Sequence, residues 1–223
     1  MVNPAPLIDY TLLKPDATEA QFALLCEEAV EQGFATVCVP PAVVSFVVDR
    51  LYGSAVRVCS VVGFPCGYNS LRQKIAETAE LVALGVDEID MVISLGHLLD
   101  GRYLLVEEEI AQVVLAAERR PVKVIIECCY LDQDLKQRAT ELVVKAGAAF
   151  VKTSTGFGTS GAVLEDVVLL AKVAAGRIGV KAAGGIRDLA SCQQMLAAGA
   201  TRIGTSAGVK IATDWQALQS TAG

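Results

Sequence analysis

Two lysines stand at the ends of two successive apolar runs that are typical of strands. Lys152 lies in AFVKTS (149–154) and Lys181 in IGVKAA (178–183), and each is followed by the Thr, Ser or Gly residues of a turn. Strands of this kind are buried on both faces, where an ammonium group is costly unless it is paired or loses its proton. An unprotonated lysine attacks carbonyl carbon. The pattern therefore predicts imine-forming chemistry.

Two neighbouring lysines make this chemistry accessible at neutral pH. A free lysine, with a pKa of about 10.4, is uncharged in only about one molecule in 2,500 at pH 7. Lowering that pKa by about three units makes roughly half of the molecules reactive and requires about 4 kcal/mol of electrostatic work. A second ammonium and an apolar barrel interior are able to supply it. We expect one lysine to attack and the other to tune it and move protons; spacing does not say which is which.

Asp90 is the third candidate for this site. It lies inside the strand-like run EIDMVIS (88–94), where a buried carboxylate needs a cationic or hydrogen-bonding partner. A purely structural ion pair is one interpretation, and proton transfer beside the lysines is the other. Lys123 precedes the apolar part of its strand, so we expect it at the opposite, structural end of the fold. Weaker candidates for the same mouth are Glu127, Asp9 and Thr155.

Glycine-rich turns follow three successive strands and could bind an anion. They read GFGTSG (156–161), AAGGIR (182–187) and RIGTSAG (202–208). Glycine allows close approach of the backbone to a ligand, and barrels often hold a phosphate with the loops after the last two strands. The alternative is that these glycines only form tight turns. The residues expected to bind substrate or phosphate are Thr155, Gly156, Gly184, Gly185, Gly204, Thr205 and Ser206.

Strand-like and helix-like segments alternate along the whole chain. Eight strands are expected at 7–11, 35–40, 57–64, 88–94, 122–129, 149–154, 178–183 and 201–206. Amphipathic helices are expected at 18–34, 71–85, 102–120, 131–147, 161–176 and 188–199. This alternation predicts an α/β fold, a (β/α)8 TIM barrel that forms a single domain over 1–223.

An open doubly wound sheet is the alternative fold, because GFGTSG (156–161) matches the glycine pattern of dinucleotide-binding turns. That pattern normally follows the first strand and is succeeded by an acidic residue at the end of the next. Here it follows the sixth strand, and the next strand ends in Lys181. The barrel is therefore favoured.

Composition excludes several classes of function. The chain has 223 residues, 53% of them hydrophobic, and a net charge of −6. No apolar stretch is long enough to cross a membrane, and the N-terminus lacks the pattern of a secretory signal, so we expect a cytoplasmic protein. The charges form no basic stripe, which argues against nucleic acid as a partner.

The cysteines and the single histidine indicate no metal site. The seven cysteines form no CxxC pair and no zinc-finger spacing, which is typical of reduced thiols used as small apolar residues. Adjacent Cys128 and Cys129 are expected to point to opposite faces of a strand. His97, the only histidine, is expected on a loop without a catalytic role.

The segments that carry these residues resemble the deoxyribose-phosphate aldolase family. The similar segments are IDYTLLKP (8–15), VCVPP (37–41), VVGFPCG (61–67), EIDMVIS (88–94), VKVIIECCYL (122–131), FVKTSTGFGTSGA (150–162), GVKAAGGIRD (179–188) and GATRIGTSAGV (199–209). The resemblance implies a class I aldolase that reversibly cleaves 2-deoxy-D-ribose 5-phosphate to acetaldehyde and D-glyceraldehyde 3-phosphate. It implies that Lys152 forms the Schiff base, that Lys181 lowers its pKa, and that Asp90 transfers protons. No metal or organic cofactor is implied, and a homodimer or higher homo-oligomer is expected.

Some positions depart from the family pattern. Tyr10 stands where the family often has His, Ala183 where it has Ser, and the loop PCGYN brings Cys66 and Tyr68. The tail QALQSTAG lacks the terminal Tyr of some members. The rival functions are another Schiff-base barrel aldolase with a different donor, a catalytically silent barrel that binds a sugar phosphate, and a nicotinamide-dependent oxidoreductase.

Overall fold

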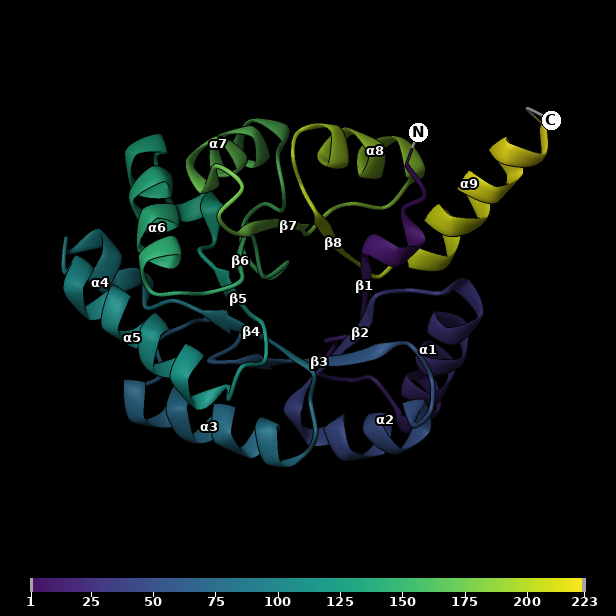
Figure 1. Cartoon of the computed structure of the whole chain (residues 1–223), viewed down its shortest axis with the longest axis horizontal. Coiled ribbons are helices and arrows are strands. Elements are labelled where there is room, and N and C mark those ends of the chain that lie inside the picture. The colour runs from purple at the N-terminus through teal and green to yellow at the C-terminus, as the bar shows by residue number, and fades with distance from the viewer. Residues whose placement is uncertain (1, 222–223) are drawn as a thin grey trace.

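A closed barrel of parallel strands forms the centre of the molecule. The computed structural model describes residues 2–221, so Met1 and the last two residues of the expected domain lie outside the described range. The strands pair in chain order from β1 to β8, and β8 pairs with β1 (Figure 1). They are β1 Ile8–Thr11, β2 Thr36–Val39, β3 Arg57–Val62, β4 Glu88–Val92, β5 Val122–Ile125, β6 Phe150–Lys152, β7 Gly179–Ala183 and β8 Arg202–Thr205. The predicted barrel is confirmed, and the open doubly wound sheet is wrong.

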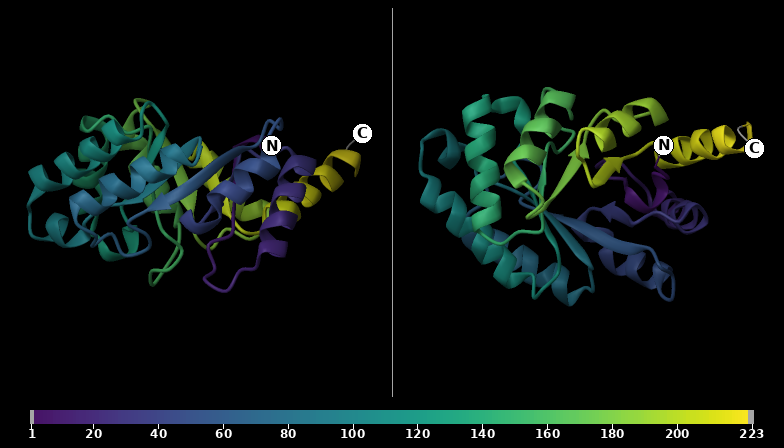
Figure 2. Two further views of the ribbon diagram at one scale, coloured as in Figure 1. Left: turned by 90° about the horizontal axis from the view of Figure 1, so that it is seen from below. Right: turned by 45° about the horizontal axis from the view of Figure 1, so that its top comes forward.

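Helices surround the barrel as an outer layer (Figure 1). They are α1 Glu19–Gln32, α2 Val44–Leu51, α3 Leu71–Ala83, α4 Leu95–Leu99, α5 Tyr103–Ala116, α6 Gln133–Lys145, α7 Leu164–Ala174, α8 Leu189–Ala197 and α9 Gly208–Thr221. Three 3-10 turns add η1 Ala5–Leu7, η2 Pro41–Val43 and η3 Cys128–Tyr130. The last helix, α9, packs near β1 and α1 and projects outward beside the N-terminal segment (Figure 2). Within residues 2–221, no helix combines the length and apolar character needed to span a bilayer.

Local signals fix where the first helix begins and ends. The backbone N–H of Thr18 donates to Oε1 of Gln21 at 2.8 Å, as the expected capping box requires. Gly33 then takes a left-handed conformation, with φ +67°, and closes the helix. This helix packs Phe22 and Leu25 into the core. The helix expected over 18–34 is therefore confirmed. Its helical residues are Glu19–Gln32, and Thr18 and Gly33 are its caps.

Several elements differ from the sequence-based expectations. Helices α2, α4 and α9 were not expected; α2 is short and rich in β-branched residues, which obscures its helical period. The expected strand 122–129 ends at Ile125, because Glu127 has a positive φ of 50° and turns the chain. Cys128 and Cys129 thus belong to a 3-10 turn, not to opposite faces of a strand. His97 lies in α4 instead of a loop.

The barrel interior is polar at one level, in contrast to its apolar outer layer. Barrel interiors are usually filled by branched apolar side chains. Here, buried charged residues come from six different strands and contact one another inside the ring. They are Asp9, Glu88, Asp90, Lys123, Lys152, Lys181 and Arg202. An ionic core of this kind needs near-complete mutual pairing, and it marks where chemistry could occur.

Candidate active site

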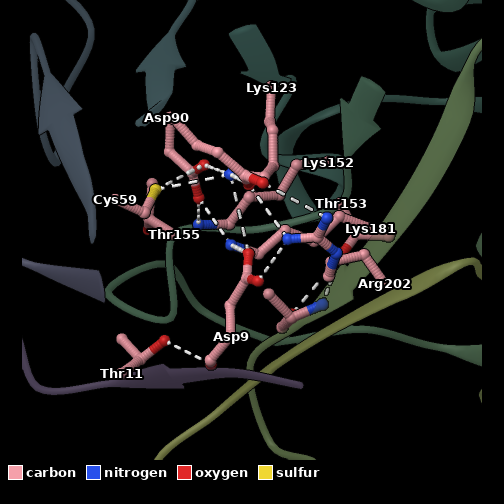
Figure 3. Close-up of polar contacts among 12 residues, drawn as sticks. Asp9, Thr11, Cys59, Asp90, Lys123, Lys152, Thr153, Thr155, Lys181 and Arg202 are labelled. Carbon is pink, nitrogen blue, oxygen red and sulfur yellow. Dashed lines mark hydrogen bonds and ion pairs between the residues drawn. The ribbon is translucent and has the colours of Figure 1, made fainter. Parts of the chain in front are cut away.

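Lys152 and Lys181 meet on a single carboxylate oxygen. They are register partners on β6 and β7. Each Nζ lies 2.7 Å from Oδ2 of Asp90, which reaches them from β4 (Figure 3). All three side chains are buried. The structure therefore brings together the three residues that the sequence singled out.

A second set of charged residues, Asp9, Glu88, Lys123 and Arg202, forms ion pairs with this group and with one another inside the barrel. Lys181 also donates to Asp9 at 2.5 Å, and Arg202 donates to the other oxygen of Asp9 at 2.7 Å. Glu88 accepts from Lys123 at 2.7 Å and from Arg202 at 2.9 Å. Among these described residues, three carboxylates face four basic side chains.

The expectation for Lys123 was wrong. Its Nζ lies 2.8 Å from Oδ1 of Asp90 and 3.3 Å from Sγ of Cys59, inside the same cluster (Figure 3). Lys123 is near the start of β5, but the strands are staggered, so its register partner is Asp90 in β4. Height along one strand therefore does not give height in the barrel. Lys123 holds the oxygen of Asp90 that faces away from the two other lysines.

Opposing effects set the protonation of the cluster. Burial alone raises the pKa of the Asp90 carboxyl, but the charges of Lys123, Lys152 and Lys181 outweigh it and hold that pKa well below its usual range. Asp9 behaves likewise: burial raises its pKa, and Lys181, Lys123 and Arg202 lower it further than burial raises it.

Lys181 shows the complementary balance. Burial lowers the pKa of its ammonium, but the carboxylates of Asp9 and Asp90 outweigh burial and raise that pKa well above the ordinary value. Lys181 therefore stays protonated at neutral pH. Burial and a like-charged neighbour alone would favour the neutral amine, but the two carboxylates that contact Lys181 outweigh them.

A cavity of about 330 Å³ opens beside Lys152. This volume suits a small molecule. Its walls include all seven residues predicted to bind substrate or phosphate: Thr155, Gly156, Gly184, Gly185, Gly204, Thr205 and Ser206. A larger hollow of about 610 Å³ lies between α8 and α9, lined mainly by apolar residues and by none of the charged cluster. The smaller cavity is the one that chemistry can use.

Two cations at this cavity were missed in the sequence. Lys14, after β1, and Arg187, after β7, both line it, and both are exposed. Neither has an ion-pair partner within residues 2–221. The AAGGIR segment contains Arg187, so the anion-binding interpretation of that turn could have included it. Lys14 carried no such signal, because its loop is remote in sequence from the glycine-rich turns.

Glycines of the three turns are required for different reasons. A Cβ on Gly204 would lie 2.9 Å from the Cβ of Ala183 and 3.0 Å from Cε of Lys181, so the side chain of Lys181 passes only over a glycine. Gly184 has φ +90°, and a Cβ on it would lie 2.9 Å from Cα of Gly161. The turns after β6 and β7 thus pack backbone against backbone. GFGTSG here serves this contact, and the expectation that it is no dinucleotide fingerprint is consistent with its place in the barrel.

A group of metal-ligand types sits behind Asp90. Donor atoms of Cys38, Cys59 and Asp90 all lie within 4.8 Å of one another and are buried. The ammonium of Lys123 already lies beside these donor atoms, 3.3 Å from Sγ of Cys59 and 2.8 Å from Asp90. A metal ion bound there would meet that positive charge at short range. These donor atoms therefore suit the ammonium of Lys123 better than a metal ion.

The departures from the family pattern fall at different distances from the cavity. Tyr10 donates to Glu28 at 2.7 Å and packs edge-on against Phe34, in the layer between barrel and helices. Ala183 lines the cavity. Cys66 and Tyr68 are exposed. The tail continues α9 to Thr221, and its last two residues lie outside the described range.

The fold and the cluster define a class of protein. A parallel eight-stranded barrel carries a buried lysine pair on one carboxylate, at the end of the strands where barrel enzymes place their active sites. This is the arrangement of a barrel enzyme that acts on carbonyl substrates through an amine. Residues 7–214 match the family model described as DeoC/LacD family aldolase. The chain belongs to this family of aldolases.

Relatives over nearly the full length support the same assignment. The chain is 56% identical over 216 residues to the deoxyribose-phosphate aldolase of Syntrophotalea carbinolica, covering 97% of this chain and 98% of that one. It is 53% identical over 210 residues to the deoxyribose-phosphate aldolase of a Geobacillus species, covering 94% of each chain. The resemblance inferred from the sequence is confirmed.

Solved structures agree with the sequence relatives. The structure described as "QR15, an Aldolase" superposes with a TM-score of 0.96 at 38% identity, covering 100% of both chains. Deoxyribose phosphate aldolase from Aeropyrum pernix, described as a unique tetrameric structure, superposes with a TM-score of 0.89 at 34% identity. That match covers 96% of this chain and 91% of the other.

Proposed function

We propose that the protein cleaves 2-deoxy-D-ribose 5-phosphate reversibly to acetaldehyde and D-glyceraldehyde 3-phosphate, through a Schiff base on Lys152. The contact of Lys152 and Lys181 with one oxygen of Asp90, beside the cavity, carries this proposal. Lys152 lines the cavity, whereas Lys181 and Asp90 lie behind it. Lys152 is therefore the amine that a bound carbonyl meets first.

The charges of the cluster support Lys152 as the nucleophile. Three carboxylates face four buried basic groups, and Arg57 adds a fifth through Glu88, so the cluster has an excess of basic groups that favours the release of a proton. Arg202 and Lys181 each contact two carboxylates, whereas Lys152 contacts Asp90 alone. Loss of a proton from Lys152 disrupts the fewest ion pairs. The resulting amine adds to the substrate aldehyde to give a carbinolamine.

Lys181 supplies and recovers the protons of the reaction. Its ammonium protonates the carbinolamine hydroxyl, which leaves as water and gives an iminium ion. The products have two and three carbons, so the C2–C3 bond breaks: its electrons form the enamine, and the 3-hydroxyl loses its proton to the Lys181 amine. Protonation of the enamine and hydrolysis then release acetaldehyde. Asp90 touches both nitrogens and keeps them within reach of one proton path.

Part of the cavity wall suits a phosphate. The glycine-rich turns after β7 and β8 line it, and Arg187 and Lys14 add two cations. A guanidinium binds phosphate oxygens through paired N–H donors. Cations and an amine that line one cavity orient a substrate that carries both a phosphate and an aldehyde.

The wider expectations belong to the same proposal. Residues 1–223 act as one aldolase domain that needs no metal or organic cofactor, in the cytoplasm. Small sugar phosphates and aldehydes are its partners, and no nucleic acid or membrane takes part. A homodimer or higher homo-oligomer is proposed; the tetrameric description of the Aeropyrum pernix aldolase supports it.

Competing donors test the reaction. Incubation of D-glyceraldehyde 3-phosphate with equal acetaldehyde and dihydroxyacetone should give only 2-deoxyribose 5-phosphate by mass spectrometry. A product from dihydroxyacetone alone would assign a different donor. No product from either donor would identify a barrel that binds sugar phosphates without reacting.

A further inference from the structure

Glu127 has an unusual backbone for a buried acidic residue. It follows β5 with φ 50° and ψ 67°, the left-handed region that favours glycine. Its side chain lies under the mouth of the barrel and only 3% of the residue is exposed. Such a conformation persists only where the surroundings determine it fully, and these positions gather at functional sites.

The carboxylate of Glu127 holds the turn after β6. It accepts the backbone N–H of Thr155 at 3.1 Å and 3.3 Å through its two oxygens, and it accepts the Thr155 hydroxyl through Oε2. A Cβ on Gly158 would lie 3.2 Å from Cδ of Glu127 and 2.8 Å from Sγ of Cys129. The turn closes over the carboxylate because residue 158 is glycine. This explains the second glycine of GFGTSG.

These contacts determine whether the Thr155 hydroxyl can donate or accept a hydrogen bond toward the cavity. A hydroxyl has one hydrogen to donate and two lone pairs to accept with. Its hydrogen goes to Glu127, and one lone pair accepts the N–H of Phe157 at 3.0 Å. One lone pair is left, and Thr155 lines the cavity next to Lys152. Toward a bound molecule, Thr155 can therefore only accept a hydrogen bond.

We propose that Glu127 is a positioning residue that locks Thr155 as a hydrogen-bond acceptor, so that the cavity selects a substrate hydroxyl that keeps its hydrogen throughout the reaction. This inference rests on the proposed function. The 3-hydroxyl of the substrate becomes the carbonyl oxygen of the three-carbon product and then has no hydrogen to donate. The 4-hydroxyl remains a hydroxyl on both sides of the reaction and is the group that Thr155 binds.

The same polarity separates the two ends of the substrate. Phosphate oxygens accept hydrogen bonds, so they are repelled by the free lone pair of Thr155. The phosphate is left to the turns after β7 and β8 and to Arg187. Thr155 thus binds a hydroxyl of the substrate, which agrees with its place among the residues predicted to bind substrate or phosphate.

Two acceptor aldehydes that differ by one hydroxyl test the proposal. D-glyceraldehyde carries the hydroxyl that becomes the 4-hydroxyl after addition of acetaldehyde, and 3-hydroxypropanal lacks it. The wild type should favour D-glyceraldehyde by about tenfold in kcat/KM, the ratio expected for one neutral hydrogen bond. In Glu127→Gln the amide NH2 donates to Thr155 and turns its hydrogen into the cavity. A substrate hydroxyl can also accept that hydrogen, so this variant is read with 2-fluoro-3-hydroxypropanal, whose fluorine can only accept: Glu127→Gln should lower the preference for D-glyceraldehyde over the fluoro aldehyde severalfold relative to the wild type.

Two further variants make the outcome unambiguous. Thr155→Val should bring the ratio of D-glyceraldehyde to 3-hydroxypropanal to about one, without relying on the folding of Glu127→Gln. Glu109→Gln is the matched control: Glu109 is a buried carboxylate in α5 that accepts the N–H of Ser94 at 2.9 Å and the ammonium of Lys74 at 2.7 Å. It should lower the melting temperature and leave the ratio intact.

The results separate this proposal from the function on which it rests. An unchanged preference over the fluoro aldehyde in Glu127→Gln overturns the positioning role. So does a ratio of D-glyceraldehyde to 3-hydroxypropanal that Thr155→Val retains, or that is one in the wild type. Failure of the wild type to add acetaldehyde to either aldehyde overturns the proposed reaction itself. A drop in ratio confined to the Glu127 and Thr155 variants supports the proposal.

Discussion

The Nζ atoms of Lys152 and Lys181 both lie 2.7 Å from Oδ2 of Asp90, although the two lysines come from the adjacent strands β6 and β7 and the aspartate from β4. One carboxylate oxygen therefore links an amine that faces the cavity to an amine buried behind it. The buried amine keeps its proton because Asp9 contacts it as well. The two lysines are chemically unequal for this reason.

The two lysines should differ in their effect on stability. Lys152→Met removes a partner from Asp90, which keeps Lys123 and Lys181, so the free energy of unfolding should change by less than about 1 kcal/mol. Lys181→Met takes an ammonium from both Asp9 and Asp90 and should cost about 3 kcal/mol. Urea denaturation measures both values.

Activity should fall in both variants, by at least about a thousandfold in kcat, because each lysine acts on the reacting atoms. Lys172→Met, an exposed lysine of α7, is the control and should leave both stability and kcat unchanged. Equal destabilisation by Lys152→Met and Lys181→Met would show that the number of carboxylates each lysine contacts does not determine its effect on stability.

Gly204→Ala should disturb catalysis through Lys181. The new methyl would lie 3.0 Å from Cε of Lys181 and 2.9 Å from the Cβ of Ala183, so the lysine must shift. A misplacement of about 1 Å in a catalytic group costs about 100-fold, so the smaller shift here should lower kcat by roughly tenfold. Gly96→Ala in α4 is the control, because a Cβ there meets nothing within 4 Å. Comparable kcat values in the two variants would refute the role of Gly204.

Arg187→Gln should weaken recognition of phosphate alone. Loss of a charge-assisted hydrogen bond at the cavity should lower kcat/KM for 2-deoxyribose 5-phosphate by roughly 10- to 100-fold. The value for unphosphorylated 2-deoxyribose should stay within about twofold. Arg50→Gln, at the end of α2, is the control. An equal loss on both sugars would place the phosphate elsewhere.

The buried carboxylates predict how stability depends on pH. The pKa of Asp9 is lowered on folding, because its cationic neighbours outweigh burial. A lowered folded-state pKa stabilises the protein above the unfolded value of about 3.9, and this contribution is lost as the pH falls below it. The stability gap between wild type and Asp9→Asn should therefore shrink by about 1 kcal/mol per pH unit below pH 4. Urea denaturation at pH 7 and pH 3 measures it, and an unchanged gap would contradict the assigned pKa direction.

Lys181 sets the upper end of the pH range in which the cluster stabilises the protein. Asp9 and Asp90 outweigh burial and raise the pKa of Lys181, so its contribution is complete below the unfolded value of about 10.4 and is lost only as the pH rises through the higher folded value. Between about pH 5 and pH 9 the contributions of Asp9 and Lys181 should therefore be constant.

The sequence was sufficient for the arrangement of Lys152, Lys181 and Asp90. A lysine after an apolar run, before a turn, lies at the mouth of a barrel whichever strand carries it, and consecutive strands are neighbours. The same rule failed for Lys123, because strand stagger sets its height against Asp90 and stagger leaves no mark in the sequence.

Contacts between distant segments explain what else was missed. The pairing of Asp9 with Arg202 joins residues 193 positions apart, and nothing near either residue indicates it. Lys14 reaches the cavity from the loop after β1. The left-handed conformation of Glu127 is a property of the folded backbone, since an acidic residue carries no signal for it.

Reductive trapping on Lys152 tests the central claim most directly. The wild type is incubated with 2-deoxyribose 5-phosphate and sodium borohydride, digested, and examined by tandem mass spectrometry. A stable two-carbon adduct, from the acetaldehyde iminium, is predicted on Lys152, together with any five-carbon adduct from the substrate iminium; both are absent from Lys152→Met. An adduct on Lys181 or on any other lysine, or no adduct in an active enzyme, would contradict Lys152 as the Schiff-base residue.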